Sequence, residues 1–320
     1  MRKRLLIFML AALMAVSALA GCAPQTATET VAPDGDRLSV VATIFPLYDF
    51  ARAVSGGLAD VTMLLSPGAE VHSFDPTAQD ILKIQNCDVF IYVGGRNDAW
   101  VDTVLGSVDM SGKRVVKLMD AVTPVEEEIV EGMQADEHAG EDAHEEYDEH
   151  IWTSPKNAML MVDAVAQAMG EADSANAEAY LENAAAYNEE IKKLDERIRA
   201  VVDSAPKKLL VVADRFPFRY LTEEYGLDYM AAFSGCSAES DVSAGTLAYL
   251  IDKVKESGIK YIYHIEMSNR QVADAVAEQT GAAPLLLHSC QNVTRAEFES
   301  GVTYVSLMAH NADNLEKGLS

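Results

Sequence analysis

The stretch that decides the fold is residues 174–204, S-A-N-A-E-A-Y-L-E-N-A-A-A-Y-N-E-E-I-K-K-L-D-E-R-I-R-A-V-V-D-S. It contains no glycine or proline, so it predicts a single helix of about 30 residues, roughly 45 Å long at 1.5 Å per residue. Ser174 is expected to cap its N-terminus. A shorter helix is predicted before it, from Ser154-Pro155 to about Met169, because proline is tolerated in a first helical turn.

Short apolar runs alternate with helical patterns on both sides of this helix. The strands predicted before it are 38–43, 60–65, 88–93 and 114–118, with helices at 48–55, 78–86 and 98–105. The strands predicted after it are 208–213, 229–232, 260–265 and 284–288, with helices at 219–225, 244–257, 269–280 and 304–317. This pattern is typical of parallel sheets covered on both faces. We therefore predict an α/β fold of two parallel-sheet lobes joined by a long backbone helix, with a cleft between the lobes. The alternative is a long core helix within a single domain.

The N-terminus predicts export. A basic segment, Met1-Arg2-Lys3-Arg4, precedes an apolar run and the sequence Leu19-Ala20-Gly21-Cys22. This is a secretory signal, and its last four residues resemble a bacterial lipobox, which implies cleavage before Cys22 and a lipid on its thiol. An ordinary signal peptide with a chance cysteine is the alternative. The expected location is the outer face of the cytoplasmic membrane, or the periplasm.

These patterns predict the following domain boundaries: a lipoprotein signal peptide at 1–21, a lipidated tether at 22–37, an N-terminal lobe at 38–172, a linking helix at 173–204 and a C-terminal lobe at 205–320. No segment after the signal approaches the apolar length of a membrane span, so a lipid is the expected attachment.

The chain is strongly acidic, with a formal net charge of −25. This charge argues against nucleic acid and anionic lipid surfaces as partners. It would attract cations, and general solubility is an equally good explanation of the acidity. The run 126–149 contains 12 Asp or Glu and no Lys or Arg. We expect a solvated loop at 120–149 that carries His138 and His144, which either collect metal ions or only fill the loop.

Three other histidines stand where predicted strands or loops end. His72 follows the second strand, His150 follows the acidic run just before a helix, and His288 ends the last strand. Open α/β sheets bind ligands beyond the carboxyl ends of their strands. Three converging imidazoles would form a zinc-type site. The alternatives are a surface histidine at His72 and a satisfied buried histidine at His288.

Cys87 lies in a predicted buried strand and is expected to be a small core residue. Cys236 and Cys290 lie in predicted loops of the second half. We expect them to pair in a disulfide, since export permits one. A zinc-binding thiolate at Cys290 is the alternative.

Several of these motifs together resemble one family. The lipobox, the P-G-x-x-x-H-x-x-x-P turn around His72, the H-I-W-T-S-P-K-N-A segment from His150 and the double α/β pattern are similar to the metal-binding lipoproteins of ABC importers, the cluster that carries zinc or manganese. The resemblance covers residues 38–319. It implies two lobes on a backbone helix, a metal ion between them, no enzymatic reaction, and an acidic histidine-bearing loop in many zinc-type members.

The resemblance also implies ligands. The first two fall on His72 and His150. The third is usually the histidine of a His-x-x-Phe-x-Tyr segment, where this chain has Arg215, which has no lone pair to offer. The fourth is usually an aspartate, where this chain has His288. A carboxylate or water would complete the site, and the carboxylate candidates are Asp214, Glu239 and Glu266. The alternative is that Arg215 pairs with one of these carboxylates, which would leave the metal three protein ligands and a water.

The sequence thus predicts a monomeric, lipid-anchored receptor that binds Zn²⁺ and delivers it to a permease driven by an ATPase. Three imidazoles favour zinc over manganese. The alternatives are a manganese or iron receptor of the same fold, a metal-dependent adhesin, and a zinc hydrolase with Glu239 or Glu266 as its general base.

Overall fold

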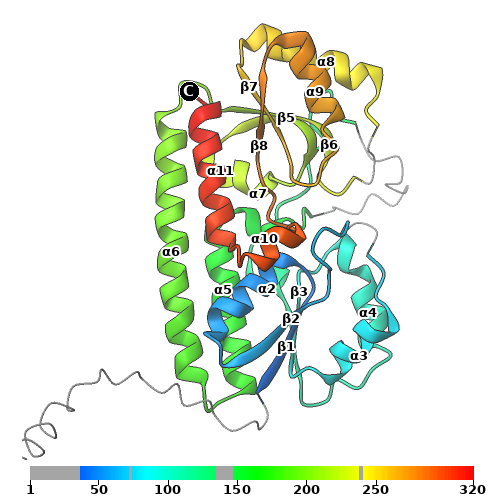
Figure 1. Ribbon diagram of the computed structural model, residues 1–320, viewed down its shortest axis with the longest axis vertical. Helices are drawn as coiled ribbons and strands as arrows, with labels where there is room; N and C mark the ends of the chain where they lie inside the picture. Colours follow the sequence, from blue (N-terminus) through cyan, green and yellow to red (C-terminus); the bar gives the residue numbers. More distant parts are fainter. Residues whose placement is uncertain (1–36, 72–73, 135–146, 238–240) are drawn as a thin grey trace, which may run out of the picture. The chain divides into compact units, whose positions relative to one another are not determined.

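Two parallel β-sheets of four strands each are formed by the described part of the chain, residues 37–71, 74–134, 147–237 and 241–320 of a computed structural model (Figure 1). The strand orders are β2-β1-β3-β4 and β6-β5-β7-β8. The first sheet comprises β1 (Leu38–Ala42), β2 (Ala59–Met63), β3 (Val89–Tyr92) and β4 (Arg114–Lys117); the second comprises β5 (Leu209–Phe216), β6 (Asp228–Ser234), β7 (Tyr261–His264) and β8 (Ala283–Leu286). The two halves therefore have the same topology. In each sheet the second strand lies on one side of the first strand and the third strand lies on its other side. α/β sheets bind ligands at such a switch point.

Helices cover both sheets and connect their strands. They are α2 (Phe45–Ser55), α3 (Ala78–Asn86), α4 (Ala99–Leu105), α5 (Pro155–Ala172), α6 (Ala177–Ser204), α7 (Arg219–Tyr225), α8 (Ala244–Ser257), α9 (Gln271–Thr280), α10 (Arg295–Glu299) and α11 (Tyr304–Gly318). Short 3₁₀ turns are η2 (Arg96–Asp98), η3 (Leu118–Ala121) and η4 (Ile151–Thr153). None of these described helices combines the length and apolarity that a membrane crossing requires.

Each sheet has its own outer helices and its own small core. In the first half α3 and α4 pack over a cluster that includes Ile84, Phe90 and Val101. In the second half α8 and α9 pack over a cluster that includes Val211 and Leu250. Burial of these side chains stabilises the outer layer of each lobe, because apolar surface is removed from water.

A shared helix layer, made of α2, α5, α6 and α11, lies along the other side of both sheets (Figure 1). One hydrophobic cluster runs from the first sheet through these helices to the second, and its members include Val40, Ile91, Leu210 and Tyr263. The buried carboxylate of Asp49 on α2 accepts hydrogen bonds from the Tyr187 hydroxyl at 2.6 Å and the Tyr304 backbone N–H at 2.8 Å. Residues 37–320 accordingly pack as one unit.

The α/β class and the two repeated sheets predicted from the sequence are confirmed. The predicted cap of the long helix is wrong: α6 begins at Ala177, and Asn176 rather than Ser174 precedes it. The turn between α5 and α6 is closed instead by Asp173, whose carboxylate accepts hydrogen bonds from the Asn176 amide at 2.7 Å and the Tyr180 hydroxyl at 2.9 Å. The preceding helix starts as predicted, with the Ser154 side chain accepting from the Asn157 backbone N–H.

Candidate metal centre

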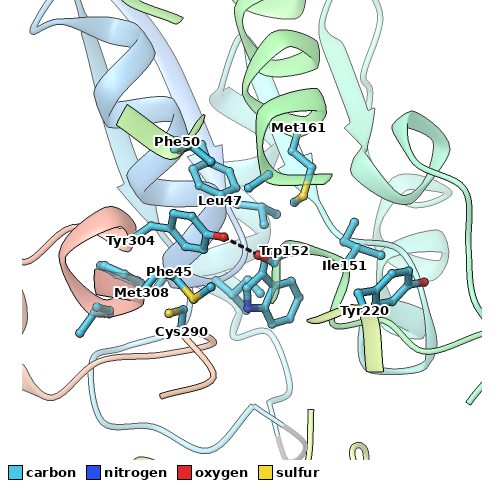
Figure 2. Packing of buried hydrophobic residues seen from close by; sticks show 14 of the residues in the cluster. Phe45, Leu47, Phe50, Ile151, Trp152, Met161, Tyr220, Cys290, Tyr304 and Met308 are labelled. Carbon is cyan, nitrogen blue, oxygen red and sulfur yellow. Dashed lines mark hydrogen bonds between the residues drawn. The ribbon is translucent and has the colours of Figure 1, made fainter. Parts of the chain in front are cut away.

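His150 is positioned by the core that follows it in the chain. Ile151 and Trp152 are buried, and the Trp152 indole N–H donates to the Ser289 carbonyl at 2.7 Å. The Trp152 carbonyl accepts from the Tyr304 hydroxyl at 2.7 Å (Figure 2). These contacts tie the start of α5 to the loop after β8 and to α11. The C-terminal end of the acidic segment is therefore held in place by the contacts of Trp152, and His150 lies between that segment and the buried pair Ile151-Trp152.

The two ring nitrogens of His150 have different surroundings. Nδ1 lies 3.1 Å from Asp148 Oδ1, which also accepts the His150 backbone N–H at 2.7 Å. We assign the proton to Nδ1, because a carboxylate can only accept. Nε2 is buried and has no hydrogen-bond partner among the described residues. A bare imidazole nitrogen whose opposite N–H is held by a carboxylate is the arrangement that metal-ligating histidines adopt.

Charge around His150 favours its cationic form. Burial lowers the pKa of His150, but the carboxylate of Asp148, helped by Glu149 and Glu127, raises it, and the resulting pKa lies above the ordinary value. The same negative potential attracts a metal cation. A proton and a metal ion therefore compete for this buried site.

Glu149 and Cys236 lie beside this imidazole. Glu149 is 3% exposed and accepts hydrogen bonds from the backbone N–H of Asn97 at 3.0 Å, from the Asn97 side-chain amide, and from the Cys236 thiol at 3.3 Å. Burial raises the pKa of Glu149 to about 7. The nearby His150 and the hydrogen bonds that Glu149 accepts from Asn97 and Cys236 lower this pKa, but by less than burial raises it. One ligand atom each from Glu149, His150 and Cys236 lies within 4.8 Å of the other two. Carboxylate oxygen, imidazole nitrogen and thiolate sulfur are the donor types that bind Zn²⁺ in proteins, so this cluster could hold the ion.

Gly235 permits this close approach. A Cβ atom at this position would lie 2.9 Å from His150 Cε1 and 2.9 Å from the Phe216 carbonyl oxygen. Both distances are shorter than a carbon atom tolerates, so any other residue would displace the imidazole or the end of β5. The Gly235 N–H also donates to Glu127 at 3.1 Å.

A pocket of about 120 Å³ lies at the carboxyl ends of the strands of both sheets. It is lined by residues 68–71, 265–267, Arg215, Ser289, Gln291 and Asn292. Arg215 pairs with Glu70, its two terminal nitrogens lying 3.3 and 3.4 Å from the carboxylate oxygens. Among the described residues this corrects the suggested pairing of Arg215 with Asp214 or Glu266, because the guanidinium pairs with Glu70 in the segment after β2 instead; Glu239 lies outside the described residues.

The other described candidate ligands, His288, Glu266 and Asp214, each bond to protein groups, although His288 Nε2, like His150 Nε2, is buried and has no hydrogen-bond partner among the described residues. His288 Nδ1 accepts the Cys290 backbone N–H at 2.9 Å, so the proton of the neutral ring is on Nε2. Glu266 accepts the Ser289 backbone N–H at 2.7 Å and the Ser289 hydroxyl, and it lies 3.6 Å from His288 Nδ1. Asp214 accepts the backbone N–H groups of Arg215 and Ile265. None of these three side chains belongs to the Glu149–His150–Cys236 cluster.

Several candidates lie outside the described residues: His72, Glu239, the loop histidines His138 and His144, and the lipidation residue Cys22. Their roles stay predictions.

The expected disulfide between Cys236 and Cys290 is corrected, because all three cysteines among the described residues are free. The Cys236 thiol is directed to Glu149, whereas Cys290 is fully buried and its sulfur lies 3.7 Å from the His288 carbonyl oxygen (Figure 2 shows Cys290 in the core beside Trp152). Cys87 is a core residue as predicted, donating to the Ile84 carbonyl at 3.1 Å.

Sequence reasoning missed two members of the cluster. Glu149 was not predicted, because it is one of 12 acidic residues in the run 126–149. Its position directly before His150 and close to the apolar pair Ile151-Trp152 is the signal that indicates burial. Cys236 follows β6 at its carboxyl end, the place where ligand-binding side chains of α/β sheets occur. That rule could have drawn attention to this cysteine.

The fold is that of a two-lobed α/β binding protein, with two repeated sheets and a shared helix layer. Its buried cluster of Glu149, His150 and Cys236 is a candidate metal site. Residues 40–318 match the family model described as "ZnuA: Zinc-uptake complex component A periplasmic", and the chain belongs to this family. The family resemblance expected from the sequence is thereby confirmed.

Named relatives are similar over most of the chain. The zinc-binding lipoprotein AdcA of Streptococcus pneumoniae is 31% identical over 292 residues, which cover 88% of this chain and 56% of AdcA. The chain thus spans little more than half the length of that relative. The high-affinity zinc uptake system protein ZnuA of Bacillus subtilis is 29% identical, with 94% of this chain and 93% of that protein covered.

The fold also matches solved structures. The Zn(II)-bound ZnuA-like domain of Streptococcus pneumoniae AdcA superimposes with a TM-score of 0.74 at 28% identity, covering 89% of this chain and 99% of the domain.

Proposed function

We propose that this protein captures Zn²⁺ outside the cytoplasm and delivers it to the permease of an ABC importer and its ATPase. The observation that carries the proposal is the buried Nε2 of His150, which has no partner among the described residues while Asp148 holds the opposite nitrogen. Membership of the zinc-uptake family supports zinc as the cargo, as do the zinc-binding names of the relatives.

Within the proposed site, His150 is the central ligand and His72, which follows β2 in the sequence, is the second. His288, Asp214, Glu239 and Glu266 are candidates for the remaining positions. His288 would have to give up the hydrogen bond from Cys290 before Nδ1 could bind an ion, or lose the proton from Nε2. Glu266 would have to exchange its two bonds from Ser289. His150 needs no such rearrangement, and we place it first for that reason.

We propose a binding protein rather than an enzyme. The family and its named relatives are uptake components. The hydrolase alternative needs a general base beside a metal-bound water. Glu266, one of its two candidates, already accepts hydrogen bonds on both carboxylate oxygens.

We also propose that the exported chain is monomeric and held to the membrane by lipid on Cys22. The basic and apolar segments before Cys22 and the lipobox-like sequence support this anchor. In this proposal the acidic stretch of sequence that contains His138 and His144 collects metal ions for the buried site. A variant without residues 136–147 should keep one tight zinc site.

Equilibrium dialysis of the purified chain against Zn²⁺ and competing Mn²⁺, followed by elemental analysis, tests the proposal. We expect one tightly bound zinc ion, lost in His150→Ala and kept in His310→Ala, which removes an exposed histidine from α11. Absence of tightly bound metal in the unaltered chain would refute it. Preferential retention of manganese would favour the manganese receptor of the same fold.

A further inference from the structure

The carboxyl end of β6 brings a thiol to His150. Cys236 lies two residues beyond β6, and its Sγ is 3.3 Å from Glu149 Oε1. It shares with Glu149 and His150 the cluster in which the three ligand atoms lie within 4.8 Å of one another. Two of these residues come from the end of the acidic segment and the third from the turn that follows β6. The cluster therefore joins parts of the chain that are 87 residues apart.

Cys236 differs from the other two free cysteines. Cys87 and Cys290 are fully buried, and the nearest polar partners of their sulfur atoms are backbone carbonyls of their own loops or helices. Those contacts are what small core residues make. Cys236 is only partly buried, and its partner is the carboxylate of a residue distant in sequence. Packing alone does not account for a thiol placed there.

The backbone beside Cys236 is pressed against the imidazole. Gly235 has no room for a Cβ atom between His150 and the Phe216 carbonyl. An independent observation is that His150 Nε2 is buried and has no hydrogen-bond partner among the described residues, so that this imidazole can still bind a ligand. Its acidic surroundings, Asp148 and Glu149 beside it, specify that the ligand is a cation.

We propose that Cys236 supplies a thiolate ligand to the captured ion, together with His150 and Glu149. This inference rests on the proposed function, because it assigns ligands to the Zn²⁺ ion that the protein is proposed to capture. On binding, the S–H bond of Cys236 breaks, its electron pair forms the bond to the metal, and the proton passes to the solvent. No oxidant or reductant is required. A soft sulfur donor selects zinc over manganese, which prefers oxygen.

Cobalt substitution tests this assignment. The purified chain is stripped of metal with a chelator, kept reduced, and titrated with Co²⁺, which takes tetrahedral zinc sites. A cobalt-bound thiolate gives an intense charge-transfer band in the near ultraviolet, whereas sites with only nitrogen and oxygen ligands do not. We expect this band in the unaltered chain, in Cys87→Ser and in Cys290→Ser, and its loss in Cys236→Ser.

Zinc affinity gives a second readout. Cys236→Ser should weaken zinc binding at least about tenfold, the lower end of the effect of removing even a supporting group around a metal. Circular dichroism confirms that the variant is folded. Zinc or cobalt binding without the band, or a band that persists in Cys236→Ser, overturns the assignment of Cys236 while the proposed function stands. Absence of any metal binding by the unaltered chain overturns both.

Discussion

Glu149 is a buried carboxyl group whose ionisation should destabilise the metal-free protein. Replacing it with glutamine removes the charge and keeps the shape of the side chain. Burial raises its pKa from the ordinary 4.5 to about 7 in the folded state. A group whose folded pKa is raised stabilises the fold at pH values below its unfolded pKa, and this stabilisation is lost as the pH rises through its folded pKa.

The size of this effect follows from the two pKa values. Their difference corresponds to about 3 kcal/mol, at roughly 1.4 kcal/mol for each tenfold change in proton affinity. Most of this loss, about 2.5 kcal/mol, develops between about pH 5 and about pH 8. The glutamine amide has one accepting oxygen where the carboxylate has two, so it cannot accept from both the Asn97 backbone N–H and the Asn97 side-chain amide, which costs about 1 kcal/mol. Glu149→Gln should therefore match the unaltered protein near pH 5 and exceed its free energy of unfolding by about 2 kcal/mol near pH 8.

Urea denaturation with a chelator present, at about pH 5 and about pH 8, measures both values for each protein. Glu182→Gln, an exposed substitution on α6, controls for the loss of a negative charge alone. Parallel pH profiles for Glu149→Gln and the unaltered protein would refute the reasoning. Glu149→Gln should also bind zinc more weakly. The carboxylate of Glu149 would then strengthen zinc binding while it lowers the stability of the metal-free protein.

Three further outcomes are expected. Asp148→Asn should weaken zinc binding about 10- to 100-fold in calorimetric titrations, because the amide no longer fixes the proton on His150 Nδ1; an unchanged affinity would exclude this orienting role. Zinc affinity, followed by chelator competition as the pH is lowered, should begin to fall above about pH 6.5, the ordinary value for histidine, because the pKa of His150 is raised; a profile that stays flat down to about pH 5 would contradict this. Trp152→Ala should lower the free energy of unfolding by about 3–5 kcal/mol in urea, since a fully buried indole and its hydrogen bond are lost; a loss below about 1 kcal/mol would contradict the packing described.

Local signals in the sequence predicted the helices and strands well. The predicted bounds of α3, α7 and α8 agree with the structure, and α8 shows why: Ser243 caps its first turn and Gly258 ends it in the left-handed conformation. Both signals act within one helical turn, so they can be read from neighbouring residues. The cap of α6 was mispredicted because Asp173 competes with Ser174, and its contact with Tyr180 depends on how the turn folds.

The site was predicted only where its residues follow local rules. His150 was found because an apolar pair and a helix start come directly after it. The pairing of Arg215 with Glu70 and the contact of Cys236 with Glu149 join residues 145 and 87 positions apart. Such contacts depend on the packing of the two sheets, which neither periodicity nor capping encodes. A carboxylate in an acidic run also gives no sign in the sequence that it is the buried one.

The shared helix layer has a consequence for how the molecule comes apart. Because one apolar cluster extends from Val40 and Ile91 to Leu210 and Tyr263, neither half can separate without exposing apolar surface of the helices that both halves cover. The two sheets should therefore melt in a single cooperative transition. A chain cut after α6 should yield two fragments that aggregate alone and fold only when mixed. Two lobes that look like separate modules are in this respect one folding unit.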